Sequence, residues 1–239
     1  MSDRDREAPA LVACAHGTRA SAGRRTMALL RLDVARARPG LDVVAAHLDV
    51  HKPALDDVVH RLATAGRPMV VVPLLLSSGY HVRVDIGRAA EKAAGLAVPA
   101  AALGPEPVLL DVLQQRLAEC GARPDDAIVM AAAGSSDPRA TADVERVASW
   151  LGEGRRAPVT PAYLAAASPA VPDAVAAARR AHPGRGVTIA TYLLAPGLFS
   201  ARLDAAGADR VAAPLAPHPA LAGLVLRRFD EARAAAPAG

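Results

Sequence analysis

The sequence has little cysteine, few aromatic residues and no long apolar run. Its two cysteines are too few for a disulfide scaffold and suit a reducing compartment. Aromatic residues make up 3%, which argues against the stacking platforms that bind single-stranded nucleic acids. Uncharged stretches reach 16 residues but contain prolines, whereas a membrane span needs ~20 largely apolar residues. The charged residues 1–7 lack a signal-peptide pattern. We therefore expect a cytoplasmic protein without a membrane segment or a nucleic-acid partner.

The sequence is rich in apolar residues, and its charged residues are spread evenly along the chain. Hydrophobic residues make up 52% and charged residues 22% of the 239 residues, which excludes intrinsic disorder. The net charge of +4 is spread evenly: residues 1–121 hold 15 basic and 13 acidic side chains, and the remainder hold 13 and 11. A weakly positive surface of this kind suits an anionic small-molecule substrate.

Short apolar runs alternate with longer segments of helical period. The first half predicts strands over residues 10–15, 41–48, 69–76 and 96–102, and helices over residues 20–37, 53–65, 82–94 and 105–119. These strands are too apolar to face water on either side. Buried strands separated by helices indicate a parallel sheet with right-handed crossovers.

The pattern then restarts, which indicates an internal repeat. Three segments of the second half, 127–136, 163–169 and 192–204, line up with residues 10–19, 47–53 and 73–85 at offsets of 117, 116 and 119. The predicted fold is α/β, with two tandem similar domains over residues 1–122 and 123–239. Each domain is expected to be a parallel four-stranded sheet flanked by helices.

Three candidate ligands follow strands of the first copy. His16 comes directly after the first strand, Asp49 closes the second, and His81 follows the third. Ligands of open parallel sheets bind beyond the carboxyl ends of the strands. Two imidazoles and one carboxylate converging there would suit a divalent metal ion with open coordination positions. Taken singly, such a histidine is usually structural and such an aspartate is usually a turn cap.

The second copy supplies an internal comparison. By the offsets, the counterparts of the three candidates are Ala133, Ala165 and Ser200. Scaffold positions persist, in the pairs Gly17/Gly134, Leu48/Leu164, Pro53/Pro169, Arg83/Arg202 and Asp85/Asp204. Joint loss of the candidates from a retained frame predicts one functional site per chain, in the first copy.

Other histidines and a cysteine near this edge are not expected to be primary ligands. We expect His47, His51 and His60 to be solvated surface residues, with His51 a second-tier candidate because it lies near Asp49. Cys14 is expected to be a small buried residue rather than a ligand.

These residues resemble the sirohydrochlorin chelatase family, the small class II tetrapyrrole metal chelatases of the CbiX and SirB type. The first motif is His16-Gly-Thr-Arg19, where the family usually reads His-Gly-Ser-Arg. The second is residues 73–85, PLLLSSGYHVRVD, which is close to a long and specific family signature. The third is Ala46-His-Leu-Asp49 before Pro53, where the family usually has Phe-Leu-Glu. The resemblance is strong in the first half and degenerate in the second.

The resemblance implies insertion of Fe²⁺ or Co²⁺, with Ni²⁺ as a further option, into a reduced tetrapyrrole of sirohaem or cobalamin biosynthesis. It implies that His16, Asp49 and His81 hold the metal, which is a substrate, and that there is no tightly bound cofactor. The two histidines would also be catalytic, because metal insertion displaces two pyrrole protons. Residues that would bind the anionic macrocycle are Arg19, Ser77, Ser78, Gly79, Tyr80 and Arg83.

Other functions remain open on the sequence. A strand followed by His-Gly-Thr is also found in histidine phosphatases, but there an arginine precedes the histidine, and here Ala15 does. A tetrapyrrole or metal carrier would need the same ligands as a chelatase, and a regulatory descendant of the family is a third alternative. The chain is expected to be a monomer or a small homo-oligomer.

Overall fold

The computed structural model describes residues 8–77 and 79–236, without the side chains of residues 80–83. Its strands form two separate sheets of four parallel strands each. The order is β2-β1-β3-β4 in the first sheet and β6-β5-β7-β8 in the second. The two orders are the same once the second copy is renumbered, so the predicted pair of repeated α/β sheets is confirmed. None of the helices in the described part of the chain has the length and apolar composition of a bilayer-crossing helix.

The first sheet is built as its apolar sequence predicts. Its strands are β1 (Ala10–Ala15), β2 (Val43–His47), β3 (Met69–Pro73) and β4 (Ala97–Pro99). Every residue of β1 and β3 is buried, as expected for central strands of a parallel sheet. β4 is shorter than the predicted strand over residues 96–102, because the pairing with β3 ends at Pro99.

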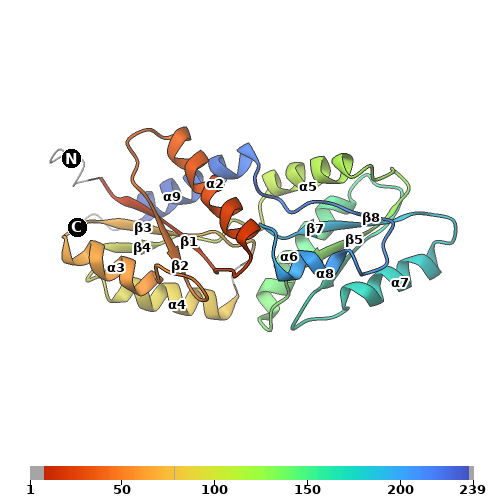
Figure 1. Cartoon of the computed structure of the whole chain (residues 1–239), viewed down its shortest axis with the longest axis horizontal. Coiled ribbons are helices and arrows are strands. Elements are labelled where there is room, and N and C mark those ends of the chain that lie inside the picture. Colours follow the sequence, from red (N-terminus) through yellow and green to blue (C-terminus); the bar gives the residue numbers. More distant parts are fainter. Residues whose placement is uncertain (1–7, 78, 237–239) are drawn as a thin grey trace. The chain divides into compact units, whose positions relative to one another are not determined.

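Helices cover both faces of this sheet (Figure 1). Three helices connect its successive strands: α2 (Ser21–Ala37), α3 (Leu55–Thr64) and α4 (Tyr80–Glu91). Ala10, Val12 and Cys14 of β1 pack in one core with α3 and α4. Because side chains alternate along a strand, the intervening residues face α2 on the other side. α4 begins two residues before the helix that the sequence predicts over residues 82–94.

The second sheet repeats the arrangement. Its strands are β5 (Ala127–Ala132), β6 (Val159–Tyr163), β7 (Val187–Tyr192) and β8 (Arg210–Val211). Its helices include α6 (Pro138–Gly152), α7 (Val171–Ala181) and α8 (Leu198–Leu203). β5 and β7 are buried throughout, like their counterparts β1 and β3.

The last helix of each repeat packs on the sheet of the other repeat. α5 (Pro107–Glu119) follows β4 in the chain but packs against β7 and α6. α9 (Pro219–Ala235) ends the second repeat but packs against α2, β3 and β4. One compact unit therefore extends to Leu103 and resumes at Pro217, and the other spans Gly104–Ala216. These units differ from the repeat boundary near residue 122, because the exchanged helices cross it in both directions.

Polar contacts fix α9 in its place. The Arg38 guanidinium donates to both carboxylate oxygens of Asp230, at 2.7 and 2.6 Å, and lies over the Phe229 ring. Arg228 Nε donates to the Ala102 carbonyl at 2.8 Å, where the chain leaves the first sheet. In the second unit, Arg116 of α5 makes the same type of contact with the Leu215 carbonyl.

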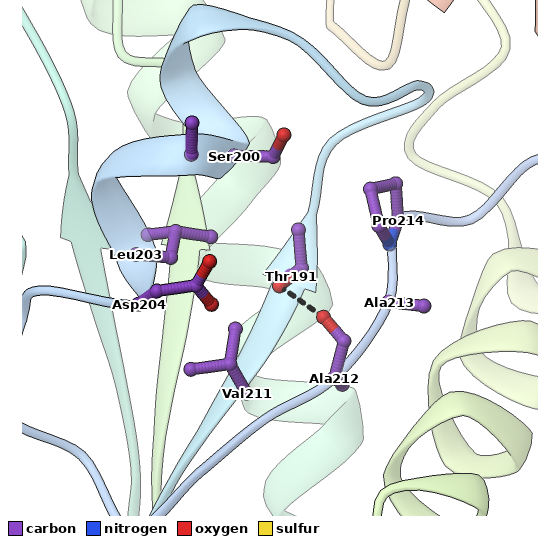
Figure 2. Close-up of a pocket in the computed structure, with 9 residues that line it drawn as sticks. Thr191, Ser200, Leu203, Asp204, Val211, Ala212, Ala213 and Pro214 are labelled. Carbon is purple, nitrogen blue, oxygen red and sulfur yellow. Dashed lines mark hydrogen bonds between the residues drawn. The ribbon is translucent and has the colours of Figure 1, made fainter. Parts of the chain in front are cut away.

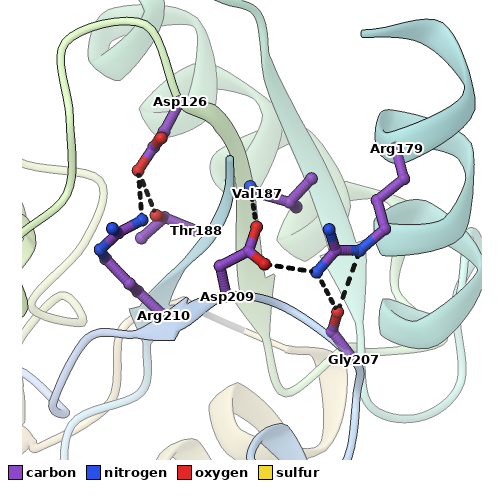
Figure 3. A network of polar contacts seen from close by, with 7 residues as sticks. All are labelled: Asp126, Arg179, Val187, Thr188, Gly207, Asp209 and Arg210. Atoms are coloured by element: carbon purple, nitrogen blue, oxygen red, sulfur yellow. Dashed lines mark hydrogen bonds and ion pairs between the residues drawn. The ribbon is translucent and has the colours of Figure 1, made fainter. Parts of the chain in front are cut away.

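A polar network joins the amino ends of β5, β7 and β8 (Figure 3). The buried Asp126 carboxylate accepts from Thr188 Oγ1 at 2.8 Å and from Arg210 at 3.2 Å. Asp209 accepts from Arg179 and from the Val187 amide. Because parallel strands start at one edge and finish at the other, this network lies at the amino edge of the second sheet, opposite that sheet's own carboxyl edge.

Candidate functional site

The strands that carry the candidate residues end together. Ala15 of β1 is level with His47 of β2, and Cys14 is level with Pro73 of β3. His16 is therefore the first residue beyond β1, and Asp49 is the second beyond β2. The sequence prediction that both lie at one edge of the sheet is confirmed, and both residues are exposed there.

Backbone contacts hold the His16 and Asp49 loops together. The Asp49 amide donates to the His16 carbonyl at 2.9 Å, and the Leu48 amide donates to the Ala15 carbonyl at 3.0 Å. Gly17 lies between the loops with φ of +103°, and a Cβ there would come 2.0 Å from the Asp49 carbonyl oxygen. Only glycine fits this close approach, so Gly17 is what allows the two loops to touch.

The Asp49 side chain has a local role as well as an exposed position. Its Oδ1 accepts from the Val50 amide at 2.6 Å, and Val50 adopts a positive φ of 63°. The Asp49 carbonyl accepts from the His51 amide at 2.6 Å. The carboxylate thus caps a tight turn, which is the plainer role that aspartate often has. One cap uses only part of a carboxylate, which has two oxygens and about four acceptor sites.

His47 is buried, contrary to the surface position expected from the sequence. It is 7% exposed, and its ring lies 4.9 Å from that of the exposed His51, edge to face. Burial lowers the pKa of His47, the hydrogen bond with the Pro53 carbonyl opposes this, and the charges of His51 and Arg31 lower it further. His51 and His60 are exposed, as expected.

A signal for the burial of His47 was available in the repeat. The counterpart of His47 at the end of β6 is Tyr163, which pairs with Ala132 as His47 pairs with Ala15. Tyr163 is also buried, at 2% exposure. A bulky tyrosine at the matching position of a sheet indicates an inward-facing side chain.

The β3–α4 segment carries the remaining predicted site residues. Gly79 is the N-cap of α4, and Ser77 is half-buried in the preceding loop. Ser78 lies outside the described residues, and so do the side chains of Tyr80, His81 and Arg83. His81 is in the first turn of α4, which starts seven residues beyond the end of β3. Its role as a third metal ligand stays a prediction.

The arginine predicted beside His16 is exposed. Arg19 lies in the loop before α2, and its carbonyl accepts from the Arg24 guanidinium at 2.5 Å. Cys14 is buried, as expected from the sequence, and that burial raises its pKa to about 12. Among residues 8–77 and 79–236, leaving aside the side chains of 80–83, no three His, Cys, Asp or Glu side chains form a metal-holding group.

The second copy builds the same loops without the donor side chains. Gly134 has φ of +89°, and its Cβ would lie 1.8 Å from the Ala165 carbonyl oxygen. The Ala165 amide donates to the Ala133 carbonyl at 3.0 Å, as Asp49 does to His16. The alignment of His16 with Ala133 and Asp49 with Ala165 is therefore confirmed. The loop geometry does not depend on histidine or aspartate.

The third aligned segment needs a correction. Pro73 pairs with Cys14 and Thr191 pairs with Ala131, which gives an offset of 118 (191 − 73) rather than 119. The N-caps Gly79 and Gly197 also differ by 118 (197 − 79). The counterpart of His81 is then Phe199, not Ser200, and the pairs Arg83/Arg202 and Asp85/Asp204 do not correspond. The second copy still lacks a histidine at this position, where Phe199 packs against the hydrophobic core.

An open pocket of about 210 Å³ lies in the second copy (Figure 2). It is formed beside α8 and the segment that follows β8. Thr191 Oγ1 donates to the Ala212 carbonyl at 2.6 Å, so its hydroxyl is used within the wall. The only charged side chain among its lining residues is Asp204. The lining therefore has no basic side chain that could pair with a carboxylate-rich ligand.

Comparison with known proteins assigns the chain to a family. The model of the CbiX family matches residues 10–120 and again residues 127–232. The chain belongs to the CbiX family. The two matches follow the two repeats, so this CbiX protein has the two-copy form expected from its sequence.

A curated relative of this CbiX protein is the sirohydrochlorin ferrochelatase of Priestia megaterium, 28% identical over 178 residues. That match covers 70% of this chain and 66% of the length of the relative. Two solved structures share the fold across the chain. SirB from Bacillus subtilis with Fe³⁺ has a TM-score of 0.76 and 22% identity, covering 94% of this chain and 95% of that one. The sirohydrochlorin chelatase SirB from Bacillus subtilis subspecies spizizenii, in complex with cobalt, has a TM-score of 0.74 and 19% identity, covering 95% and 96%.

Proposed function

We propose that this CbiX protein inserts a divalent metal ion, Fe²⁺ or Co²⁺, into sirohydrochlorin or a related reduced tetrapyrrole. The observation that carries the proposal is the contact between the His16 and Asp49 loops at the carboxyl edge of the first sheet. The second copy repeats that contact with alanines in place of both donors. The names of the curated relative and of the two SirB structures support the substrate and the choice of metals.

The metal is a substrate in this reaction. His16 and His81 would hold the incoming ion through neutral imidazole nitrogens, and Asp49 would offset part of its charge. Asp49 is one methylene shorter than the glutamate usual at this position in the family. Its Oδ1 already caps the Val50 amide, so its second oxygen is the one to meet the ion. A partly filled coordination sphere suits an ion that must leave for the macrocycle.

Each inserted ion displaces two protons from pyrrole nitrogens. A base near the macrocycle must accept them, and imidazole is the side chain that gains and loses protons near neutral pH. His16 is exposed at the sheet edge, where it can pass a proton on to water. We assign the acceptor role to His16 or His81 once the metal has left that imidazole.

The macrocycle carries several carboxylates, and this edge of the protein can pair with them. Arg19 is exposed two residues beyond Gly17, and Arg83 lies in the first turns of α4. Charge-assisted pairs of this type are the strong hydrogen bonds of such sites. Ser77, Ser78, Gly79 and Tyr80 precede or open α4, where backbone amides point toward an anion.

Turnover by purified protein tests the proposal. Metal-free sirohydrochlorin is mixed with Co²⁺ or Fe²⁺, and metallation is followed by visible absorption against the uncatalysed rate. We expect saturable turnover by the wild type and a loss of at least ~100-fold in His16→Ala and His81→Ala, the lower end of what a positioned proton acceptor contributes. His60→Ala is the matched control, because His60 is an exposed histidine of the same sheet unit on α3.

Two results would contradict the proposal. Binding of the macrocycle without faster metallation would identify a tetrapyrrole or metal carrier, which uses the same ligands. Full activity in both histidine variants would show that the chemistry lies elsewhere and would favour a regulatory descendant of the family.

A further inference from the structure

His47 and His51 form a pair of imidazoles beside the candidate site. His47 ends β2 and is 7% exposed, whereas His51 is exposed in the loop that follows. Their ring centroids lie 4.9 Å apart, with an interplanar angle of 82°. Two imidazoles on one tetrahedral ion have ring centres about 5 Å apart, because each metal–nitrogen bond is about 2.0–2.1 Å and each centre lies about 1 Å further out. The observed separation matches that spacing.

The hydrogen bond of His47 leaves one of its nitrogens available. Nδ1 lies 3.3 Å from the Pro53 carbonyl, and a carbonyl can only accept, so Nδ1 carries the proton. In the neutral ring Nε2 then has a lone pair. Metal-ligating histidines are typically oriented in this way, by a backbone carbonyl on the other nitrogen.

The loop does not need these imidazoles in order to fold. In the second copy the positions of His47 and His51 are Tyr163 and Ala167, at the offset of 116 that the register confirms. The backbone is the same in both: Val50 and Ala166 have φ of 63° and 56°, and the His47 and Tyr163 amides donate to the Pro53 and Pro169 carbonyls. The imidazoles occur only in the copy that has His16 and Asp49.

We propose that His47 and His51 form a second, exchangeable site for the divalent metal ion, which delivers the ion to the His16–Asp49 edge. The delivery step rests on the proposed function, whereas the metal site does not. Asp49 lies between the two histidines in the chain, and its carbonyl accepts from the His51 amide. Iron and cobalt ions both accept imidazole ligands.

The surroundings make the site weak, which suits delivery. Two imidazoles would fill only part of a coordination sphere, so water would occupy the other positions. The Arg31 guanidinium acts electrostatically on His47, and its Nη1 is buried without a hydrogen-bond partner among the described residues. A nearby positive charge opposes a bound cation, so the ion is released readily.

Cobalt binding without tetrapyrrole tests the site. The parent is the His16→Ala/His81→Ala protein, in which the main site is disabled. We expect it to bind Co²⁺ with visible ligand-field bands of nitrogen ligation. Adding His47→Tyr and His51→Ala, which are the residues of the second copy, should weaken this binding at least tenfold. Adding His60→Ala instead should leave it unchanged. Thermal unfolding checks that each variant is folded.

If Co²⁺ binding is unchanged when His47→Tyr and His51→Ala are added to the parent, the proposed second metal site is wrong. This conclusion does not depend on the turnover of the wild type. For delivery, His47→Tyr/His51→Ala in the otherwise native chain should raise KM for Co²⁺ about tenfold with kcat retained. A fall in kcat with unchanged KM would overturn delivery. Absence of turnover by the wild type would refute the proposed function and the delivery step together, and the binding result would still decide the site.

Discussion

Replacing Gly17 with alanine should separate the two loops that form the candidate site. Gly17 has φ of +103°, and the added Cβ would come 2.0 Å from the Asp49 carbonyl oxygen. No rotation of a methyl group relieves that clash, because the neighbour is backbone. The loops must part, and the hydrogen bond from the Asp49 amide to the His16 carbonyl is lost.

The expected cost has two parts. A non-glycine residue held in such a conformation costs about 1–3 kcal/mol, and a lost hydrogen bond adds about 1 kcal/mol. Gly17→Ala should therefore lower the free energy of unfolding of its unit by about 2–4 kcal/mol. It should also weaken Co²⁺ binding and metallation at least tenfold, because His16 and Asp49 no longer lie together.

The second copy provides a matched control. Gly134→Ala places a Cβ 1.8 Å from the Ala165 carbonyl oxygen, at φ of +89°, so it should destabilise its own unit by a similar amount. Its loops carry no donors, so metallation per folded molecule should stay unchanged. Denaturant unfolding and absorption kinetics measure the two effects. Equal activity losses in the two variants would refute the assignment of the site to the first copy.

Three further predictions concern helix exchange, charge and pH. Phe229→Ala should expose β3 amides to hydrogen exchange, at a cost of about 3–5 kcal/mol, whereas Leu113→Ala should expose β7 amides, because α9 and α5 pack on those strands. The reverse pattern would contradict the exchange. Asp49→Asn keeps the cap on the Val50 amide but removes the charge, so KM for the metal should rise at least about tenfold at unchanged stability; steady-state kinetics showing no change would exclude the carboxylate as a ligand. The Arg38 hydrogen bond lowers the pKa of Asp230, so its contribution of about 0.5–1 kcal/mol is complete above pH ~4 and is lost as the pH falls through the lower folded-state pKa. Wild type and Asp230→Asn should therefore differ in unfolding free energy near neutral pH and converge in acid, and a constant difference would contradict this.

Much of the site was predictable because it depends on local pattern. Buried strands read as apolar runs, and the residue after each run must lie at the carboxyl edge of a parallel sheet. His16 and Asp49 were placed in this way. Alignment of the repeats worked in the β1–β2 segments but was off by one residue from β3 to α4. Residue identities there favoured an offset of 119, whereas the strand register and the helix N-caps both give 118.

Burial of single polar residues was less predictable. Apart from the tyrosine at the matching position of the second copy, the sequence gives no signal that His47 is buried. Its place beside Ala15 and its hydrogen bond with the Pro53 carbonyl hold it in the interior. A polar ring can be buried when a partner satisfies its hydrogen bond, and a partner six residues away in a turn is not visible as a pattern.

The sequence by itself determined two copies of one α/β unit, the order of their elements, and the copy that holds the donor residues. Only the tertiary structure decided that α5 covers the second sheet and α9 the first, and that the Gly17 loop touches Asp49. The physical reason is that the hydrophobic effect is non-directional. An apolar helix face must be covered, but its apolar character does not specify which of two similar sheets covers it. Directional polar contacts, such as that of Arg38 with Asp230 of α9, select one arrangement.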